Sequence, residues 1–460
     1  MSTSKRIFGT DGVRGVANIE PVTAETALKL GRAVGHVFKR LQSEARDKVR
    51  HRVVLGKDTR LSGYMLENAI SSGVLSMGVD VLLIGPLPTP GVAYVTRSLR
   101  ADAGIVITAS HNPYADNGLK FFRADGYKLD ETIEKEIEGL VFSGAIEHVR
   151  PTADHIGKAS RIDDALGRYI EYAKASFPRG MTLEGMRVVV DCANGAAYKS
   201  TPCVLRELGA EVILLGNQPD GKNINRDCGS MHPESLCQRV RDFRADAGLA
   251  HDGDADRVLM CDESGRLVDG DDIMAIATLD MLAQGTLAER TLVTTVMSNS
   301  GLDAAICAAG GKVVRTDVGD KNVIDEMLRH GYNFGGEQSG HIIFRDFCTT
   351  GDGLVAALQI LRIMKARNAR LGELAACWTR FPQVIANVVV REKRPLDQLE
   401  GVAALVAQAA AEIQAQGGRV FLRYSGTEPK ARLLLEGQDA ALLQKWREQI
   451  CVAIQQQIGA

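Results

Sequence analysis

Short apolar runs alternate with helix-like stretches over roughly the first 380 of the 460 residues. The expected strands are 52–56, 80–84, 103–108, 187–191, 211–215, 247–251, 258–261, 292–296 and 312–315. Continuous apolar runs of this length are typical of parallel strands that helices cover, so the pattern predicts βαβ units. Between residues 23 and 41 the apolar side chains recur at helical spacing, and Thr23 is the expected N-cap.

The last part of the chain has a different pattern. We expect strands at 384–390, 420–424 and 432–436, an Ala-rich helix at 395–414, and a closing helix along the apolar stripe from Leu442 to Ile458. This pattern predicts a small α+β domain. Polar stretches near 150–160, 262–266 and 378–383 indicate domain boundaries. A pattern of strand, helix, strand and Gly-rich loop recurs three times without a sequence repeat of fixed period, so we expect a threefold structural repeat.

Composition narrows the class of protein. The 55 basic and 57 acidic residues give a net charge of −2, which offers no reason to expect nucleic acid or an anionic membrane as partner. The nine cysteines include no CxxC pair, which favours reduced thiols. We find neither an apolar secretory region at the N-terminus nor an apolar run near 18 residues. The expectation is a cytoplasmic protein that acts on a small molecule.

The first candidate site is the stretch Thr108-Ala-Ser-His-Asn-Pro113, directly after an apolar run. Ser110 then lies just past the carboxyl end of a strand, where open α/β sheets place ligands, and its hydroxyl could act as a nucleophile. Two alternatives stay open. Ser110 could simply cap a turn, and His111 could be a hydrogen-bonded loop residue.

A second candidate is His251-Asp-Gly-Asp-Ala-Asp-Arg257, in which Asp252, Asp254 and Asp256 occupy every second position. Three carboxylates in a compact loop repel one another unless a divalent cation neutralises them. An EF-hand does not fit, because its sixth position holds Arg257 instead of glycine and strand-like runs flank the loop. The loop suits magnesium in phosphoryl transfer, and a solvated acidic turn is the alternative.

Two further loops carry polar groups beside glycines. Gly335 to His341 (GGEQSGH) offers Glu337, Ser339 and His341, a set that could hold sugar hydroxyls. Arg423 to Pro429 (RYSGTEP), with Arg432 beyond, combines hydroxyls, backbone amides and guanidinium groups, which are the parts of a phosphate site. Each could also be an ordinary turn. Together, however, the four loops would supply a nucleophile, a metal site, a sugar-binding site and a phosphate-binding site.

In this order, ITASHNP, DGDADR, GGEQSGH and RYSGTEP resemble the four signature loops of the α-D-phosphohexomutase superfamily. The resemblance runs from FGTDGVRG (Phe8 to Gly15) to LLEG (Leu434 to Gly437). It implies three related α/β domains with mixed, mostly parallel sheets plus a smaller C-terminal α+β domain around a central cleft. The expected domains are 1–158 with the phosphoserine loop, 159–262 with the metal loop, 263–380 with the sugar loop and 381–460 with the phosphate loop.

The resemblance also implies a role for each loop. Ser110 would carry the phosphoryl group, and Mg²⁺ would bind to Asp252, Asp254, Asp256 and a Ser110 phosphoryl oxygen. Glu337 and Ser339 would hold sugar hydroxyls. The side chains expected to line the reacting centre are Arg14, His111, Lys120, Arg257 and His341, with His111 and Lys120 as candidate bases. The residues expected to bind the non-reacting phosphate are Arg423, Ser425, Gly426, Thr427 and Arg432.

Within the superfamily the resemblance is strongest to the bacterial branch that acts on glucosamine phosphate. The implied activity interconverts glucosamine 6-phosphate and glucosamine 1-phosphate on the route to UDP-N-acetylglucosamine. Glucosamine 1,6-bisphosphate or glucose 1,6-bisphosphate would be the intermediate or activator. A mannose or glucose phosphate mutase and a non-catalytic sugar-phosphate-binding regulator are the alternatives, and both a monomer and a homodimer stay open.

The chain departs from the branch's usual pattern in two places. Thr316 to Val323 reads TDVGDKNV, where the branch usually has VGDRYV, so Lys321 and Asn322 alter the loop expected to read the sugar. Ala255 stands where the metal loop often has glycine.

Overall fold

The computed structural model describes residues 6–9, 11–45, 50–425 and 429–459. The chain forms two compact units, one of Met1–Val296 with Val314–Ala375 and one of Met297–Val313 with Ala376–Ala460. We describe each unit by itself.

The first sheet has six strands and helices on both faces. Its order is β1 (Val13–Val16), β5 (Asp116–Arg123), β4 (Ala103–Ile107), β2 (Arg52–Lys57), β3 (Asp80–Pro86) and β6 (Ala159–Arg161). The strands from β4 to β6 are parallel, whereas β5 runs antiparallel to both β4 and β1.

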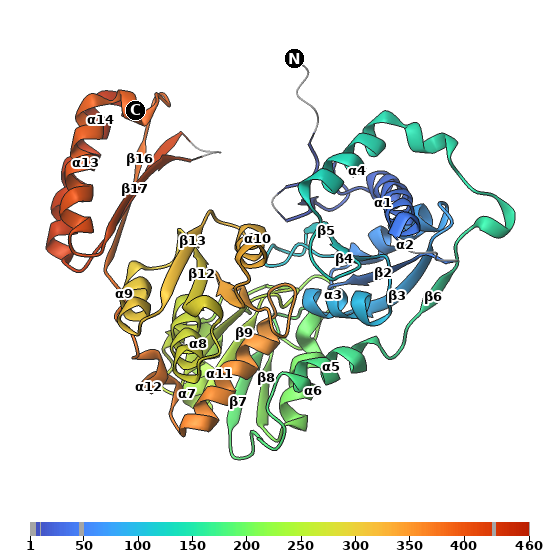
Figure 1. The fold of residues 1–460 in the computed structure, drawn as a ribbon, viewed down its shortest axis with the longest axis horizontal. Coiled ribbons are helices and arrows are strands. Elements are labelled where there is room, and N and C mark those ends of the chain that lie inside the picture. The colour runs from blue at the N-terminus through green and yellow to red at the C-terminus, as the bar shows by residue number, and fades with distance from the viewer. Residues whose placement is uncertain (1–5, 10, 46–49, 426–428, 460) are drawn as a thin grey trace. The chain divides into compact units, whose positions relative to one another are not determined.

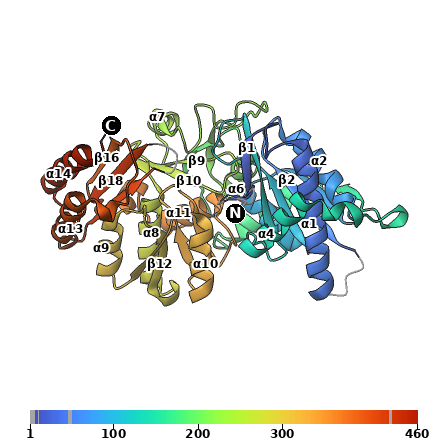
Figure 2. The same cartoon turned by 90° about the horizontal axis from the view of Figure 1, so that it is seen from above.

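Helices cover both faces of the first sheet and pack their apolar sides against it. On one face, α1 (Ala24–Ala45), α2 (Gly63–Leu75) and α4 (Glu131–Ser143) share one core with the strands (Figures 1 and 2). Figure 1 shows α3 (Thr89–Ser98) on the opposite face. The Thr23 hydroxyl accepts a hydrogen bond from the Thr26 amide at 3.2 Å, which confirms the predicted cap of α1.

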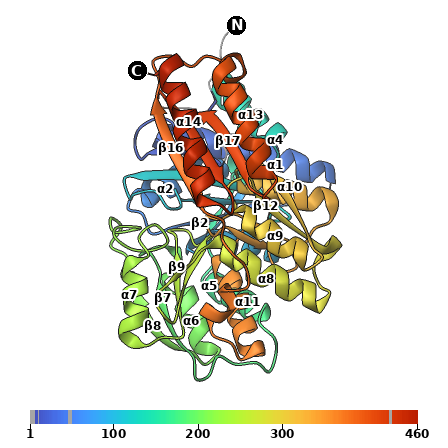
Figure 3. The ribbon, with the colours of Figure 1, turned by 90° about the vertical axis from the view of Figure 1, so that its left-hand side faces the viewer.

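The second sheet contains the metal-loop candidate. Its order is β11 (Leu267–Val268), β10 (Val258–Asp262), β9 (Ala247–His251), β7 (Arg187–Asp191) and β8 (Glu211–Leu215). Leu236 and Val240 of α7 (Glu234–Phe243) pack against one face of this sheet. Figure 3 shows α7 and α6 (Ser200–Glu207) on opposite sides of these strands, with α5 (Ala165–Ala175) beyond α6.

The third sheet is shorter. Its order is β13 (Lys312–Thr316), β12 (Thr291–Thr295), β14 (Phe334–Gly336) and β15 (Ile342–Phe344). The helices of this part of the chain are α8 (Gly270–Gln284), α9 (Ser300–Ala308), α10 (Asp320–His330), α11 (Gly353–Arg367) and α12 (Leu371–Ala375). Asp269 and Asp352 cap α8 and α11 through their carboxylates.

The three sheets share one strand order. Counted from β2 in the first sheet, β7 in the second and β12 in the third, the first strand lies between the second and the third in chain order, and the fourth pairs antiparallel with the third. The third-to-fourth connection is therefore a hairpin in every case: β4 to β5, β9 to β10, and β14 to β15. These hairpins carry Ser110, the three aspartates and Glu337 to His341. The predicted fold class, with three related α/β domains, is confirmed.

The smaller unit contains the antiparallel sheet β16 (Gln383–Val389), β18 (Lys430–Glu436) and β17 (Arg419–Tyr424). Helices α13 (Glu400–Gln414) and α14 (Ala440–Ile458) form its core with one face of the sheet. The helix expected from residue 395 begins five residues later. Pro395 is extended and leads into a 3₁₀ turn, Leu396–Gln398, before the non-helical Leu399.

Among the described residues, no helix is both long and apolar enough to cross a membrane.

His251 ends β9 with its ring fully buried. Its Nδ1–H donates to the Arg257 carbonyl at 3.2 Å and Nε2 accepts from the Thr201 hydroxyl at 3.0 Å, so the native ring is neutral. Burial lowers the pKa of His251 to about 4. An unfolded chain then binds the proton more tightly than the native one, so stability falls as the pH drops below the ordinary histidine value.

We predict that His251 alone removes about 2 kcal/mol of stability between pH 7.5 and pH 5. The measurement is the denaturant midpoint of wild type and His251→Gln at both pH values. The variant should lose less stability on acidification, whereas His232→Gln, at an exposed histidine, should follow wild type. Equal losses in wild type and His251→Gln would contradict the prediction.

Candidate functional site

Ser110 lies in the hairpin after β4 and is 1% exposed. Its hydroxyl donates to Asp252 Oδ2 at 2.6 Å, and His111 Nδ1 lies 3.3 Å from the Ser110 hydroxyl oxygen. The backbone of Ser110 has a φ of +52°, a left-handed conformation that costs a non-glycine residue about 1 kcal/mol or more. Neighbouring groups must therefore hold the loop in place.

Arg60 is the group that holds this loop. The guanidinium is fully buried, pairs with Asp58 at 2.8 Å, and donates to the carbonyls of Ser110 and Asn112 at 2.9 and 2.8 Å. It also donates to the carbonyls of Pro113 and Asp116. Asp58 in turn accepts from the Thr108 hydroxyl at 2.7 Å. Because β2 and β4 are parallel neighbours, their carboxyl ends bring Asp58 and Ser110 to the same edge of the sheet.

The metal-loop candidate approaches the serine loop closely. A Cβ at Gly253 would lie 2.5 Å from the Ser110 carbonyl oxygen, so a side chain there would push the two loops apart. Asn225 also holds the serine loop, because its Nδ2 donates to the carbonyls of Ser110 and Asn112 at 2.9 and 3.0 Å. The hydroxyl of Ser110 and the carboxylates of the next sheet are thus brought together by backbone contact.

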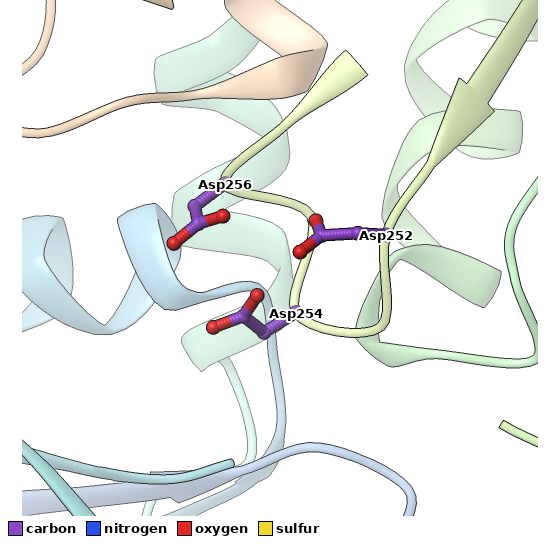
Figure 4. A group of neighbouring side chains, drawn as sticks. All are labelled: Asp252, Asp254 and Asp256. Atoms are coloured by element: carbon purple, nitrogen blue, oxygen red, sulfur yellow. The ribbon is translucent and has the colours of Figure 1, made fainter. Parts of the chain in front are cut away.

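Asp252, Asp254 and Asp256 occupy the hairpin between β9 and β10, and all three are buried. Each offers a carboxylate oxygen, and these oxygens lie within 4.8 Å of one another (Figure 4). Between them, Ala255 has a φ of +56°, which a glycine would adopt without steric cost. Burial, and then the charges of Asp256 and Asp254, raise the pKa of Asp252 well above its usual value.

The residues present fit a divalent cation. Asp254 Oδ1 and Asp256 Oδ1 are buried and accept no hydrogen bond within the described residues, so two carboxylate oxygens are available as ligands. The other oxygen of each accepts from Lys120 Nζ at 2.8 Å, and Asp254 also accepts from the Thr89 hydroxyl at 2.6 Å. Hard oxygen ligands with open positions are what Mg²⁺ prefers.

Charged side chains continue from the aspartates into a closed ring. Lys120 also lies 3.2 Å from Asp11, which pairs with Lys128, and Lys128 pairs with Asp320. His341 closes the ring, with Nε2 at 3.4 Å from Asp320 and Nδ1 at 3.7 Å from Asp256. The ring joins the strands and loops of all three sheets.

The pKa shifts in this ring all favour ion pairs. Burial by itself would lower the pKa of each lysine. The neighbouring carboxylates outweigh burial, so they raise the pKa of Lys120 well above its usual value and also raise that of Lys128. Burial raises the pKa of Asp11, but Lys120 and Lys128 outweigh it and hold the pKa well below normal. Lys120 is therefore a cation here and can give a proton but not accept one.

Three further predicted side chains surround this centre. Arg14, on β1, donates to Asp11, and the pKa of Arg14 is raised by Asp11, Asp254 and Asp256 in spite of burial. Arg257 Nε lies 3.9 Å from Asp256 Oδ1. His111 is half-buried, and burial, Arg257 and Arg14 lower its pKa, which favours a neutral ring able to accept a proton.

The third loop is the hairpin between β14 and β15. Glu337 is buried and accepts from the Gly319 amide at 3.0 Å, whereas Ser339 is exposed. The His341 ring is buried, and the Gly351 amide nitrogen lies 3.1 Å from its Nε2. His341 therefore brings the sugar-loop candidate into contact with Asp256. The Gly319 amide helps to hold the Glu337 carboxylate in place.

The fourth loop belongs to the smaller unit. Arg423 and Arg432 are cross-strand partners on β17 and β18, and Ser425 is buried with its carbonyl accepting from Lys393 Nζ at 2.6 Å. Two like charges placed opposite each other repel, so an anion between them would be favourable. Gly426 and Thr427 lie outside the described residues.

Four models of one protein family match successive segments of the chain. The segments are phosphoglucomutase/phosphomannomutase α/β/α domain I over residues 5–147, domain II over 167–265, domain III over 269–381 and the C-terminal domain over 385–453. The chain belongs to the phosphoglucomutase/phosphomannomutase family. The resemblance to the α-D-phosphohexomutase superfamily is thereby confirmed, and the chain is an isomerase of this kind.

Individual relatives agree with the family. Phosphoglucosamine mutase of Syntrophotalea carbinolica is 57% identical over 455 residues, covering 99% of this chain and 98% of the relative. The protein of the same name from Anaeromyxobacter dehalogenans is 56% identical over 464 residues, covering 99% and 100%.

Solved structures share the fold of this phosphohexomutase. A phosphoglucomutase/phosphomannomutase family protein from Burkholderia thailandensis matches with a TM-score of 0.81 and 24% identity over 98% of this chain and 97% of its own. Aspergillus fumigatus N-acetylphosphoglucosamine mutase, in complex with GlcNAc-6P and magnesium, matches with a TM-score of 0.64 and 17% identity over 99% and 96%.

Sequence reasoning missed five side chains that organise this centre. Asp58 and Arg60 follow a predicted strand, so the rule that sites form at carboxyl ends of strands could have found them. Asp11 lies within FGTDGVRG, but only the structure shows that it bridges two lysines. Lys128 carried no local signal, and although Asp320 lies within the loop from Thr316 to Val323, its pairing with Lys128 spans 192 residues of sequence and appears only in the structure.

We predict that Lys128→Met and Asp320→Asn are coupled, because each single change leaves a charge in the ring without its main partner. Each should lower the free energy of unfolding by about 2–3 kcal/mol, and the double variant should lose clearly less than the sum. The measurement is a double-mutant cycle by chemical denaturation. Lys135→Met, which breaks an exposed pair with Glu131, should cost under about 1 kcal/mol. Strictly additive losses would show that the pair does not interact.

Proposed function

We propose that this chain interconverts glucosamine 6-phosphate and glucosamine 1-phosphate through a phosphoserine at Ser110, feeding UDP-N-acetylglucosamine synthesis. The observation that carries the proposal is the 2.6 Å contact between the Ser110 hydroxyl and Asp252, one of three buried carboxylates, in a chain 57% identical to a phosphoglucosamine mutase over its full length. A nucleophile next to a cation site suits phosphoryl transfer.

The chain's own residues would move protons and phosphoryl groups as follows. The Ser110 O–P bond of the phosphorylated enzyme breaks while a new O–P bond forms at the free 1- or 6-oxygen of the sugar phosphate. The proton of that sugar hydroxyl goes to a base, and His111 suits this role better than Lys120, which the carboxylates hold as a cation. The leaving Ser110 oxygen takes up a proton as its O–P bond breaks. After the bisphosphate has turned over, the Ser110 hydroxyl gives up that proton as it accepts the other phosphoryl group, and the sugar oxygen that is released takes one up.

Asp252, Asp254 and Asp256 would hold Mg²⁺, together with a phosphoryl oxygen on Ser110. The ion would supply positive charge to neutralise the transferring phosphoryl group. Arg14, Arg257 and Lys120 add fixed positive charge around the same position, and buried charges of this kind need little reorganisation during the reaction.

The sugar and the distant phosphate would be held by the other two loops. We assign Glu337, Ser339 and His341 to the sugar, and Arg423, Ser425, Gly426, Thr427 and Arg432 to the phosphate that does not react. A diffusible glucosamine or glucose 1,6-bisphosphate would prime Ser110. The protein would work in the cytoplasm, with four domains bounded near residues 158, 262 and 380.

The unusual pair in the sugar loop has partners within the protein. Lys321 Nζ lies 3.3 Å from Glu134 on α4, and Asn322 Nδ2 donates to the Val318 carbonyl at 3.1 Å. Both side chains thus help to shape the loop whose Gly319 amide donates to Glu337. This arrangement supports a sugar loop that keeps its function with Lys321 and Asn322 in place.

We predict that kcat/KM for glucosamine phosphate exceeds that for mannose and glucose phosphates by more than about tenfold. The assay uses purified protein with Mg²⁺ and a trace of sugar bisphosphate. A preference for mannose or glucose phosphate would overturn the substrate assignment but keep the mutase chemistry. A phosphorylated protein that turns over none of the three would instead be a sugar-phosphate-binding regulator.

We also predict that Ser110→Ala lowers kcat by at least ~1000-fold, because the variant has no oxygen to carry the phosphoryl group. Ser72→Ala is the matched control, since that side chain is exposed on α2 and its hydroxyl donates to the Asn68 carbonyl. It should keep full activity. Full activity of Ser110→Ala would refute the phosphoserine route.

A further inference from the structure

Thr89 is a fully buried polar residue outside the four signature loops. It is the first residue of α3, and only Leu87 and Pro88 separate it from the end of β3. Because β3 and β4 both run parallel to β2, the carboxyl ends of the three strands lie at one edge of the first sheet. Thr89 therefore lies at the same edge of the sheet as the loop that carries Ser110.

Two hydrogen bonds of Thr89 go to one residue of the metal-loop candidate. The Thr89 amide donates to the Asp254 carbonyl at 2.9 Å, and the Thr89 hydroxyl donates to Asp254 Oδ2 at 2.6 Å. The first bond fixes where the backbone of Asp254 lies, and the second fixes how its carboxylate is turned. A residue of the first sheet's domain thus holds a carboxylate that belongs to the second sheet.

The two carboxylate oxygens of Asp254 have different surroundings. Oδ2 accepts from Lys120 Nζ at 2.8 Å as well as from Thr89. Oδ1 is buried and accepts no hydrogen bond from the described residues. The Cβ–Cγ torsion of an aspartate is broad, so a carboxylate without partners would exchange its two oxygens by rotation. The two donors on Oδ2 oppose that rotation, and Oδ1 remains the oxygen that a cation can reach.

We propose that Thr89 is a positioning residue that orients Asp254 for a divalent cation. The inference rests on the proposed function, which places Mg²⁺ at Asp252, Asp254 and Asp256. A neutral hydroxyl suits this task, because it holds the carboxylate without adding positive charge that would repel the ion. Side chains that hold metal ligands in place typically contribute about 10- to 100-fold to metal affinity.

The test compares Thr89→Val with Thr89→Ser by isothermal titration calorimetry of the full chain with Mg²⁺, without sugar phosphate. Mass spectrometry matches the phosphorylation of Ser110 among the samples. Valine has nearly the shape of threonine and keeps the amide that donates to Asp254, so the change removes the hydroxyl alone. We expect Thr89→Val to bind Mg²⁺ at least ~10-fold more weakly, and Thr89→Ser, which keeps the hydroxyl, to stay within about threefold of wild type.

Thr96→Val is the matched control. Thr96 lies on the same helix, is also fully buried, and donates its hydroxyl to the Val92 carbonyl at 2.8 Å. It is roughly 10 Å from Thr89 along the helix at the usual rise per residue. This variant should bind Mg²⁺ like wild type. If Thr89 served only the stability of the fold, both valine variants would unfold more easily and neither would change the affinity for Mg²⁺.

The inference is overturned if Thr89→Val binds Mg²⁺ as wild type does, if Thr89→Ser is as weak as Thr89→Val, or if Thr96→Val weakens binding equally. A wild type that binds no Mg²⁺ would overturn both this role and the cation site. Turnover of glucosamine, mannose and glucose phosphates tests the proposed function separately. A wild type that turns over none of them, but loses Mg²⁺ affinity on Thr89→Val, would refute the function and support the role of Thr89.

Discussion

Three carboxylates buried within 4.8 Å of one another repel strongly unless positive charge lies among them. This constraint organises the centre of the protein. Lys120 reaches Asp254 and Asp256 at 2.8 Å, and Asp11, Lys128, Asp320 and His341 continue the alternation of charge back to Asp256. Members of the ring come from all three sheets, so charge balance at the metal-loop candidate also sets how the sheets meet. Asp254 Oδ1 and Asp256 Oδ1 accept no hydrogen bond from the described residues, so both are available to a cation.

The repeated topology explains why such distant residues can meet. Each of the three sheets ends a parallel strand with a hairpin into an antiparallel partner, and each hairpin carries one functional loop. A hairpin at the carboxyl end of a parallel strand projects beyond the sheet, where loops from neighbouring domains can touch. Gly253 makes that contact close, since any side chain there would collide with the Ser110 carbonyl. The Ser110 hydroxyl of one domain is thereby placed against a carboxylate of another.

Much of the fold was predictable because apolar runs and loops of unusual composition are local signals. The runs around β2, β4, β7 and β9 identified parallel strands, and the four loops identified the superfamily. Strand β5 was missed, because Asp116-Asn-Gly118 has turn composition and Lys120 is charged, and only pairing with β1 and β4 makes the segment a strand. The ring of charge was missed for a related reason: Lys128 and Asp320 acquire their partners only in three dimensions. Roles for individual side chains at the centre stay predictions.

The account depends most directly on phosphoryl transfer from Ser110. The measurement is to load Ser110 with ³²P-phosphate, add unlabelled glucosamine 6-phosphate, and follow the label over single turnovers by rapid quench. The account predicts that label leaves the protein for a sugar bisphosphate and then for the monophosphate product, with little inorganic phosphate released. Isomerisation that proceeds while the label stays on Ser110 would contradict it.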